Sequence, residues 1–259
     1  MRIISLGWGT QSTALAVMAA LGDIEPVDFA IHADTTHERT ATYEYAKMFT
    51  PWLEDRGVKV LTVTGDNLPV EIMPNGKTRT GLPCFMFTNS GKGQLSRNCT
   101  NNWKIAPMRR AISAELKAHG FKKTPGIVKQ LLGISMDEYQ RMRDSDVKYI
   151  TNEYPLIDKH MNRHDCKRYI KDAGLPIPAR SSCMFCPYQR KSEWRELRNN
   201  SKKDWRRAVE VDAEVRKARP PYDLFICDQI KPLPECDLST PQDHGQMEFD
   251  LCDSGYCFV

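Results

Sequence analysis

The sequence predicts an α/β protein with a mostly parallel sheet flanked by helices, followed by a helical, cysteine-containing C-terminal part. Two observations support this fold class. Short β-branched runs alternate with helix-like stretches in the first part of the chain, an order typical of parallel strands whose connecting helices cover both faces of a sheet. A turn of small and hydroxyl residues also follows the first predicted strand and leads directly into an alanine-rich stretch.

The predicted elements follow this alternation along the chain. Strands are predicted at 2–6, 28–33, 58–64 and 127–134. Helices are predicted at 13–21, 40–56, 104–119, 137–143 and 163–173, with one or two more in 192–219 before a proline-rich stretch. The polar segment 73–98 holds several glycines and is too long for an ordinary connection, so we expect it to be either functional or disordered.

Composition limits the class of protein. The chain has 259 residues, of which 41% are hydrophobic and 27% are charged, as in a soluble globular protein. Its net charge of +4 is too small to indicate a nucleic-acid partner by itself, and no apolar run approaches the ~20 residues that span a bilayer. The sequence enters a strand without a signal peptide, so we expect a cytoplasmic protein with no membrane association. In that compartment nine cysteines indicate metal binding or redox chemistry rather than a disulfide framework.

The turn after the first strand, SLGWGTQS at 5–12, is the first candidate site. Such a turn places backbone N–H groups at the positive end of a helix, where they stabilise an anionic group. A buried strand with a glycine turn and no ligand is an equally good interpretation of this turn alone.

The end of the second predicted strand is the second candidate site. Asp34 and Thr35 follow it, and the carboxyl ends of parallel strands are where ligands bind in such sheets. A carboxylate with hydroxyl groups suits a ribose or a metal-bound phosphate, although Asp and Thr are also favoured as helix caps.

Both segments resemble motifs of the adenine nucleotide alpha hydrolase superfamily, in its phosphoadenylyl-sulfate (PAPS) reductase-like branch. Gly9-Thr10-Gln11-Ser12 matches the second half of the pyrophosphatase loop, with Gly7 where that loop begins with Ser, and the segment from Asp34 resembles the Asp-Thr-Gly…Glu-Thr-Tyr motif. The resemblance covers roughly residues 1–190. It implies an adenine nucleotide alpha hydrolase-like fold that binds ATP, or a related adenine nucleotide, with Mg²⁺. The residues implied in binding are Ser5, Gly7, Gly9, Thr10, Gln11, Ser12, Asp34 and Thr35.

Three cysteines extend the resemblance to iron–sulfur members of that family. The segment from Cys99 to Pro107 resembles their first cysteine element, with Thr100 in place of a second cysteine. Cys183 and Cys186 form the Cys-x-x-Cys element that follows, with 83 residues between Cys99 and Cys183. The resemblance implies a [4Fe–4S] cluster on these three thiolates, as in three-cysteine nucleobase thiolases. The same thiolates suit zinc, and buried cysteines without a metal are a further interpretation.

The tail holds the candidate catalytic residue. Reductases of this family carry a nucleophilic cysteine near the C-terminus, and Cys257 lies in the matching region with Cys252 as a candidate resolving partner. Cys257 also suits a fourth cluster ligand, and an inert tail is the remaining interpretation.

The segment 190–207 carries eight Lys or Arg residues together with Trp194 and Trp205. A solvated helix face over core tryptophans explains this pattern, and so does a footprint for tRNA or DNA.

Together these features predict a nucleotide-binding domain with the metal site at 1–190 and a helical, proline-rich extension with the cysteine tail at 191–259. The implied function is ATP-dependent adenylation and cluster-assisted sulfur transfer to a nucleic acid or small-molecule acceptor, with a sulfur donor protein as a further partner. One alternative is a reductase of adenylyl or phosphoadenylyl sulfate (APS or PAPS) that uses Cys257. Another is a zinc-stapled nucleic-acid-binding protein without catalysis. The acceptor and the oligomeric state stay open.

Overall fold

The computed structural model describes residues 1–65, 67–240 and 243, and it divides the chain into two compact units. Unit 1 comprises residues 1–65 and 103–181, and unit 2 comprises the described parts of 66–102 and 182–259. This division differs from the boundary expected at residue 190. The chain leaves unit 1 after its third strand, and the segment 66–102 packs with the C-terminal part instead.

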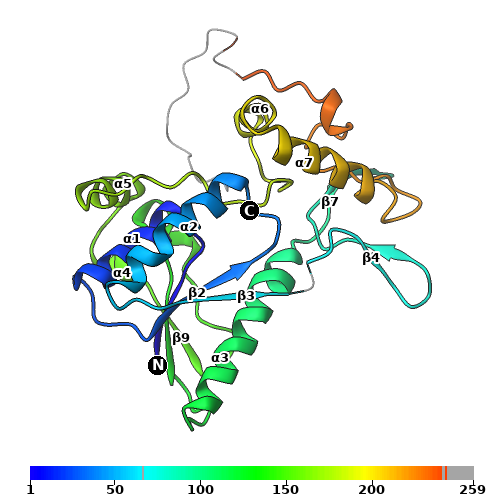
Figure 1. The fold of residues 1–259 in the computed structure, drawn as a ribbon. Coiled ribbons are helices and arrows are strands. Elements are labelled where there is room, and N and C mark those ends of the chain that lie inside the picture. The colour runs from blue at the N-terminus through cyan, green and yellow to red at the C-terminus, as the bar shows by residue number, and fades with distance from the viewer. Residues whose placement is uncertain (66, 241–242, 244–259) are drawn as a thin grey trace. The chain divides into compact units, whose positions relative to one another are not determined.

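Unit 1 is built on a five-stranded parallel sheet in the order β3-β2-β1-β8-β9, which confirms the predicted fold class (Figure 1). The strands are β1 (Arg2–Ser5), β2 (Phe29–Asp34), β3 (Val60–Thr64), β8 (Val128–Leu131) and β9 (Ile150–Glu153). The α-helices are α1 (Thr10–Leu21), α2 (Thr40–Glu54), α3 (Ala106–Ala118), α4 (Pro155–Asp158) and α5 (Arg163–Asp172). A π-helical turn η1 (Thr100–Ile105) leads into α3, and a 3₁₀ segment η2 (Met136–Arg141) follows β8. None of the helices in the described residues is long and apolar enough to cross a membrane.

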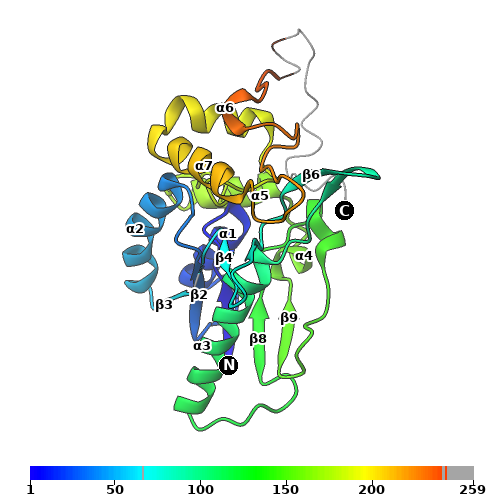
Figure 2. The ribbon, with the colours of Figure 1, turned by 90° about the vertical axis from the view of Figure 1, so that its right-hand side faces the viewer.

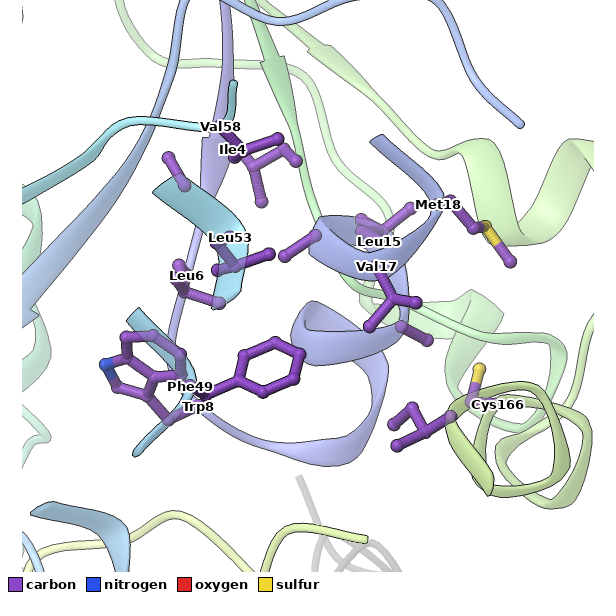
Figure 3. Packing of buried hydrophobic residues seen from close by; sticks show 14 of the residues in the cluster. Ile4, Leu6, Trp8, Leu15, Val17, Met18, Phe49, Leu53, Val58 and Cys166 are labelled. Atoms are coloured by element: carbon purple, nitrogen blue, oxygen red, sulfur yellow. The ribbon is translucent and has the colours of Figure 1, made fainter. Parts of the chain in front are cut away.

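The sheet is buried on both faces because alternate residues of each strand point to opposite sides. Ile4 faces a cluster that includes Leu15 of α1, Phe49 of α2 and Ile170 of α5 (Figure 3). Its neighbour Ile3 faces a second cluster, with Ile112 and Leu116 of α3. Helices therefore cover both sides, and the two faces of β1, the central strand, are fully buried.

The order of the strands places a reversal point beside β1. From β1 the chain adds β2 and β3 on one side, and it later adds β8 and β9 on the other. At such a reversal the connections leave the carboxyl edge in opposite directions and open a crevice between them. For this strand order the rule places a ligand site at the carboxyl edge of the sheet, beside the ends of β1 and β8.

The described residues of unit 2 form two β-hairpins and two α-helices. Its elements are β4 (Glu71–Ile72), β5 (Thr78–Arg79), β6 (Phe85–Thr88), β7 (Gly91–Gln94), α6 (Lys191–Asn200), α7 (Lys202–Val215) and a 3₁₀ turn η3 (Leu233–Glu235). The segment expected as one long loop therefore contains three short strands, with β5 paired to β4 just before it and β6 paired to β7.

The buried Asp212 of α7 ties the proline-rich segment to that helix. Its carboxylate accepts hydrogen bonds from the backbone N–H groups of Ile226 (3.1 Å) and Leu233 (3.0 Å), and it also pairs with Arg216. Because a buried carboxylate is stable only when its oxygens are satisfied, these bonds fix the path of residues 226–233 against α7.

Candidate functional site

The loop after β1 lies at the carboxyl edge of the sheet, beside the reversal point, and leads into a helix that has no side-chain cap. Gly9 is the N-cap of α1, and no side chain accepts a hydrogen bond there. The loop is closed on itself by Ser12, whose Oγ accepts from Gly7 N (3.2 Å) and donates to Gly9 O (3.2 Å). The Thr10 hydroxyl, on a residue that is 2% exposed, has no hydrogen-bond partner among the described residues. Unsatisfied donors at the first turn of a helix are the arrangement that stabilises an anionic group.

Trp8 anchors this loop in the core. Its φ is +57°, a left-handed conformation that side chains rarely adopt. The indole is 1% exposed and packs edge-on against His32 and Phe49, with ring centroids 6.0 and 6.3 Å away. Burial of the indole offsets the strain of the backbone and holds the loop in one conformation.

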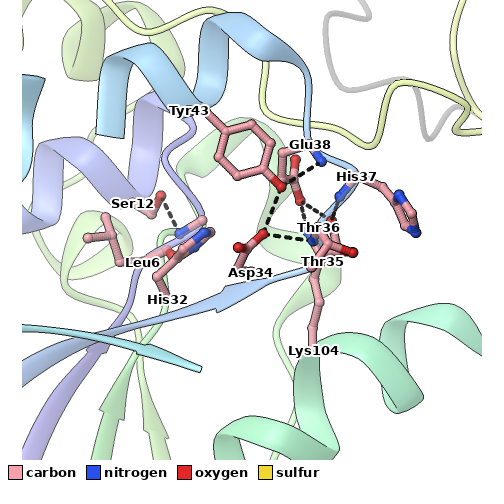
Figure 4. A network of polar contacts seen from close by, with 11 residues as sticks. Leu6, Ser12, His32, Asp34, Thr35, Thr36, His37, Glu38, Tyr43 and Lys104 are labelled. Carbon is pink, nitrogen blue, oxygen red and sulfur yellow. Dashed lines mark hydrogen bonds and ion pairs between the residues drawn. The ribbon is translucent and has the colours of Figure 1, made fainter. Parts of the chain in front are cut away.

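His32 supports the base of the same loop from β2. Its Nδ1 lies 3.0 Å from the carbonyl oxygen of Leu6, so the neutral ring donates from Nδ1 (Figure 4). Burial lowers the pKa of His32 below 6.5, although the bond to Leu6 opposes that shift. The imidazole is therefore held neutral beneath the loop.

Two further residues enclose the loop, and neither was singled out from the sequence. A Cβ atom built on Gly133, just after β8, would lie 2.6 Å from the backbone nitrogen of Ser12. Cβ atoms built on Gly7 and Gly9 would lie 3.9 and 3.8 Å from the Oγ of Ser181. Gly133 was hidden by the expectation that the strand at 127–134 runs through it, and Ser181 carries no local signal. The loop is thus enclosed by segments that are distant in sequence.

The second candidate segment forms a polar network at the end of β2 (Figure 4). Asp34 Oδ1 accepts hydrogen bonds from Thr36 N (2.7 Å) and from the Tyr43 hydroxyl (2.7 Å). Burial and this carboxylate raise the pKa of Tyr43 above its ordinary value, so its proton is held on the phenol. Thr35 is fully buried and donates to Glu38 Oε1 (3.3 Å). Asp34 therefore organises its own turn, whereas the Thr35 side chain lies inside the network.

Glu38 and Lys104 form an ion pair that sequence reasoning missed. The Glu38 side chain is 1% exposed, and Lys104 Nζ lies 2.9 Å from its Oε1. The other carboxylate oxygen is buried and has no hydrogen-bond partner among the described residues. Lys104 comes from η1, 66 residues away in the sequence, so no local pattern indicates this pair.

The three cysteines expected to bind a metal all belong to unit 2. Cys99 N donates to Gly81 O (2.9 Å), and Cys186 N donates to Cys183 O (3.1 Å), which makes the Cys-x-x-Cys a tight turn. All three side chains are partly exposed, and none forms a disulfide. Within the described residues no group of three or more His, Cys, Asp or Glu side chains is gathered closely enough to hold a metal ion. The arrangement does not by itself fit a cluster or zinc, so the metal site stays a prediction.

The remaining expected residues are Ser5, which is partly exposed at the end of β1, and the tail cysteines. Cys252 and Cys257 lie outside the described residues. A catalytic role of Cys257 therefore stays a prediction from the sequence.

Comparison with known proteins gives a likeness of fold. No family model and no curated protein matches the chain. Among solved structures, the chain is similar to a phosphoadenylyl-sulfate (PAPS) reductase from Candida auris in its phosphate complex. The two share 15% sequence identity with a TM-score of 0.43, over 68% of this chain and 74% of that chain. A likeness of this degree assigns no activity, and the α/β class itself is established by the parallel sheet of unit 1.

Proposed function

We propose that the chain is an adenine-nucleotide-using enzyme that adenylates an acceptor with ATP and then transfers sulfur to it. The observation that carries the proposal is the loop at 5–12. It combines an uncapped helix, a position at the reversal point of the sheet and a buried hydroxyl that has no partner in the described part of the chain. Such a loop suits a polyphosphate, and the sequence motifs at 9–12 and 34–45 resemble those of enzymes that cleave ATP to AMP and pyrophosphate.

The proposed chemistry has two steps. An acceptor oxygen attacks the α-phosphorus of ATP, and the bond to the pyrophosphate oxygen breaks. A sulfur nucleophile then attacks the activated carbon of the acceptor, and AMP leaves. In the first step the N–H groups of Gly9, Thr10 and Gln11 would stabilise the charge that develops on the pyrophosphate. Mg²⁺ bound with the nucleotide would neutralise part of the same charge.

The source of sulfur is a donor protein or a cluster, and the acceptor is a nucleic acid or a small molecule. The adenylation step does not depend on the cysteines of unit 2, and within the described residues no group of side chains is gathered for a metal.

Calorimetry of ATP binding in the presence of Mg²⁺ tests the loop. Gly9→Val adds an isopropyl group where phosphate would approach the backbone, so it should abolish binding without unfolding the protein. Ala20→Val adds two methyl groups at the other end of α1 and should bind ATP like the unmodified chain. Unchanged affinity in Gly9→Val would exclude the loop as the nucleotide site.

Product analysis separates the proposed function from its alternatives. Acceptor-dependent release of pyrophosphate supports adenylation, and its absence with every acceptor would favour a binding protein. Formation of sulfite from APS or PAPS, lost in Cys257→Ser with nucleotide binding intact, would instead show a reductase, because a hydroxyl is far less nucleophilic than a thiolate.

A further inference from the structure

In unit 2, α6 ends at Asn200 and α7 begins at Lys202, so the two helices are joined by a tight junction (Figure 2). Four cationic residues at this junction are exposed. These residues, which we call the α6–α7 corner, are Arg198, Lys202, Lys203 and Arg206. None of them forms an ion pair or side-chain hydrogen bond with any residue that the structure describes. The only acidic residue within 198–206 is Asp204, which is 1% exposed and so does not neutralise the surface.

Neighbouring cations on the same helices are paired, which sets this corner apart. Arg195 pairs with Asp243, and Arg207 bonds Glu214 at 2.7 Å and Glu210 at 3.3 Å. The positive charge therefore gathers at the corner and is compensated away from it.

Two of the four cations lie where helix electrostatics disfavour them, whereas Arg198 lies in the last turn of α6, where a cation is favoured. Lys202 and Lys203 open α7, and the positive end of a helix dipole repels cations. Arg206 follows at i+4 and i+3 from these two lysines, so like charges share one face of the first turns. Ser201 provides no side-chain cap. The like charges at the start of α7 are unfavourable for the isolated fold, because they repel one another. They become favourable when a polyanion binds across them.

The chemistry around the corner favours a nucleic acid over an anionic membrane. The exposed neighbours are Asn199 and Asn200, whose amides can donate to phosphates and base edges. From residue 178 to 240 no large hydrophobic side chain is highly exposed among the described residues, whereas a membrane-bound helix needs apolar side chains to insert. Trp205, which lies between Lys203 and Arg206 in the sequence, is partly exposed, and its indole can contact a nucleic-acid base.

We infer that the α6–α7 corner of unit 2 binds the phosphate backbone of a nucleic acid. Each of the four cations, unpaired within the described residues, can replace a counterion on a phosphate, so the affinity should fall steeply with salt. The inference depends on the proposed function in one respect only. If the chain adenylates an acceptor, the nucleic acid bound at the corner is that acceptor.

Fluorescence anisotropy with a labelled 20-nucleotide single strand tests the corner. The test variant carries Arg198→Gln, Lys202→Gln, Lys203→Gln and Arg206→Gln. The matched control removes four exposed lysines scattered over unit 1 with the same loss of net charge: Lys47→Gln, Lys117→Gln, Lys122→Gln and Lys171→Gln. The test variant should lose about 0.7 units of the salt slope per phosphate contact, roughly 3 units in all. Its affinity at 0.1 M salt should fall at least tenfold, and the control should keep most of its slope.

Three results would overturn the inference: no binding by the unmodified chain, equal losses in both variants, or binding to phosphatidylserine vesicles in place of the oligonucleotide. Calorimetry with ATP separates this inference from the proposed function, because both variants should bind ATP like the unmodified chain. If the oligonucleotide binds at the corner but ATP does not bind at all, nucleic-acid binding by the corner is supported. The proposed function is then wrong, and with it the role of the nucleic acid as acceptor.

Discussion

Gly133 lies so close to the first turn of α1 that a Cβ atom built on it would be 2.6 Å from the backbone nitrogen of Ser12. The same atom would lie 2.8 Å from the Cα of Ser12, so the obstacle is backbone and cannot rotate away. The end of β8 therefore presses on the turn whose amides we assign to phosphate binding. Only glycine permits this approach.

Replacement of Gly133 by Ala should push β8 and α1 apart. We expect a loss of about 1–3 kcal/mol in the free energy of unfolding, as for other overpacked sites, and at least a tenfold loss of ATP affinity. Urea unfolding and calorimetry measure the two effects. Gly7→Ala is the control for the unfolding measurement, because its added Cβ would have no neighbour closer than 3.9 Å. Equal stability of the two variants would contradict the close packing at Gly133.

The Glu38–Lys104 pair should respond unequally to the loss of either partner. Lys104→Met leaves a carboxylate that is 1% exposed without its cation, whereas Glu38→Gln leaves an ammonium on a side chain that is 37% exposed and still hydrated. We therefore expect Lys104→Met to destabilise the fold more, by about 1–3 kcal/mol, because an unpaired buried charge is the costly state. Urea unfolding of both variants and of the double variant measures the coupling. A larger cost for Glu38→Gln would contradict the burial of the carboxylate.

His32 should make stability depend on pH. Its folded pKa is lowered by burial, so the unfolded chain binds the proton more readily. The contribution of neutral His32 to the free energy of unfolding is therefore complete above the unfolded pKa of 6.5. It is lost as the pH falls from there toward the folded pKa. His32→Gln should make the free energy of unfolding depend less on pH between pH 7 and 5. The loss of slope should correspond to about one bound proton at most. His119→Gln, at an exposed position, is the control and should leave the slope unchanged. Identical slopes in all three proteins would remove His32 as the cause.

Much of unit 1 could be predicted because its strands and helices carry strong local patterns. The β-branched runs of β1, β2 and β3 stand out, whereas β9 has the sequence ITNE and pairs only at the edge of the sheet. The hairpins of unit 2 were missed because strands of two to four residues leave little periodicity. Asn75-Gly76, with Gly76 at φ +74°, is a turn signal that could have indicated the first of them.

The site was predictable only where it is continuous in sequence. The loop at 5–12 lies within one strand–turn–helix unit, and the structure places it at the edge that parallel strands require. Gly133, Ser181 and Lys104 reach the site through tertiary packing, which no spacing along the chain encodes. The fixed conformation of Trp8 also escaped prediction, because a left-handed φ at a tryptophan depends on the pocket that holds the indole.

Metal analysis of anaerobically purified protein tests the three-cysteine site. If Cys99, Cys183 and Cys186 hold a shared [4Fe–4S] cluster, each single Ala variant should lose iron, sulfide and visible absorption together, since ligands of one site act as a unit. A colourless protein with one zinc ion per chain would show that the three cysteines hold zinc and not a cluster.

Cys227 and Cys236 provide the matched control for this metal test. Both belong to unit 2, and both are buried, with 1% and 5% of the residue exposed. The Sγ of Cys227 donates to Asp228 Oδ1 (3.8 Å), and the Sγ of Cys236 donates to the carbonyl oxygens of Lys231 (3.7 Å) and Pro232 (3.6 Å), so each thiol already has a partner. Ala at either position should lower the melting temperature through lost packing and leave the metal content per folded chain unchanged.

Full metal content in the Cys99, Cys183 and Cys186 variants would exclude the three-cysteine site. Metal loss confined to the Cys227 and Cys236 variants would move the site to that buried pair, where two thiols would need further ligands from elsewhere in the chain.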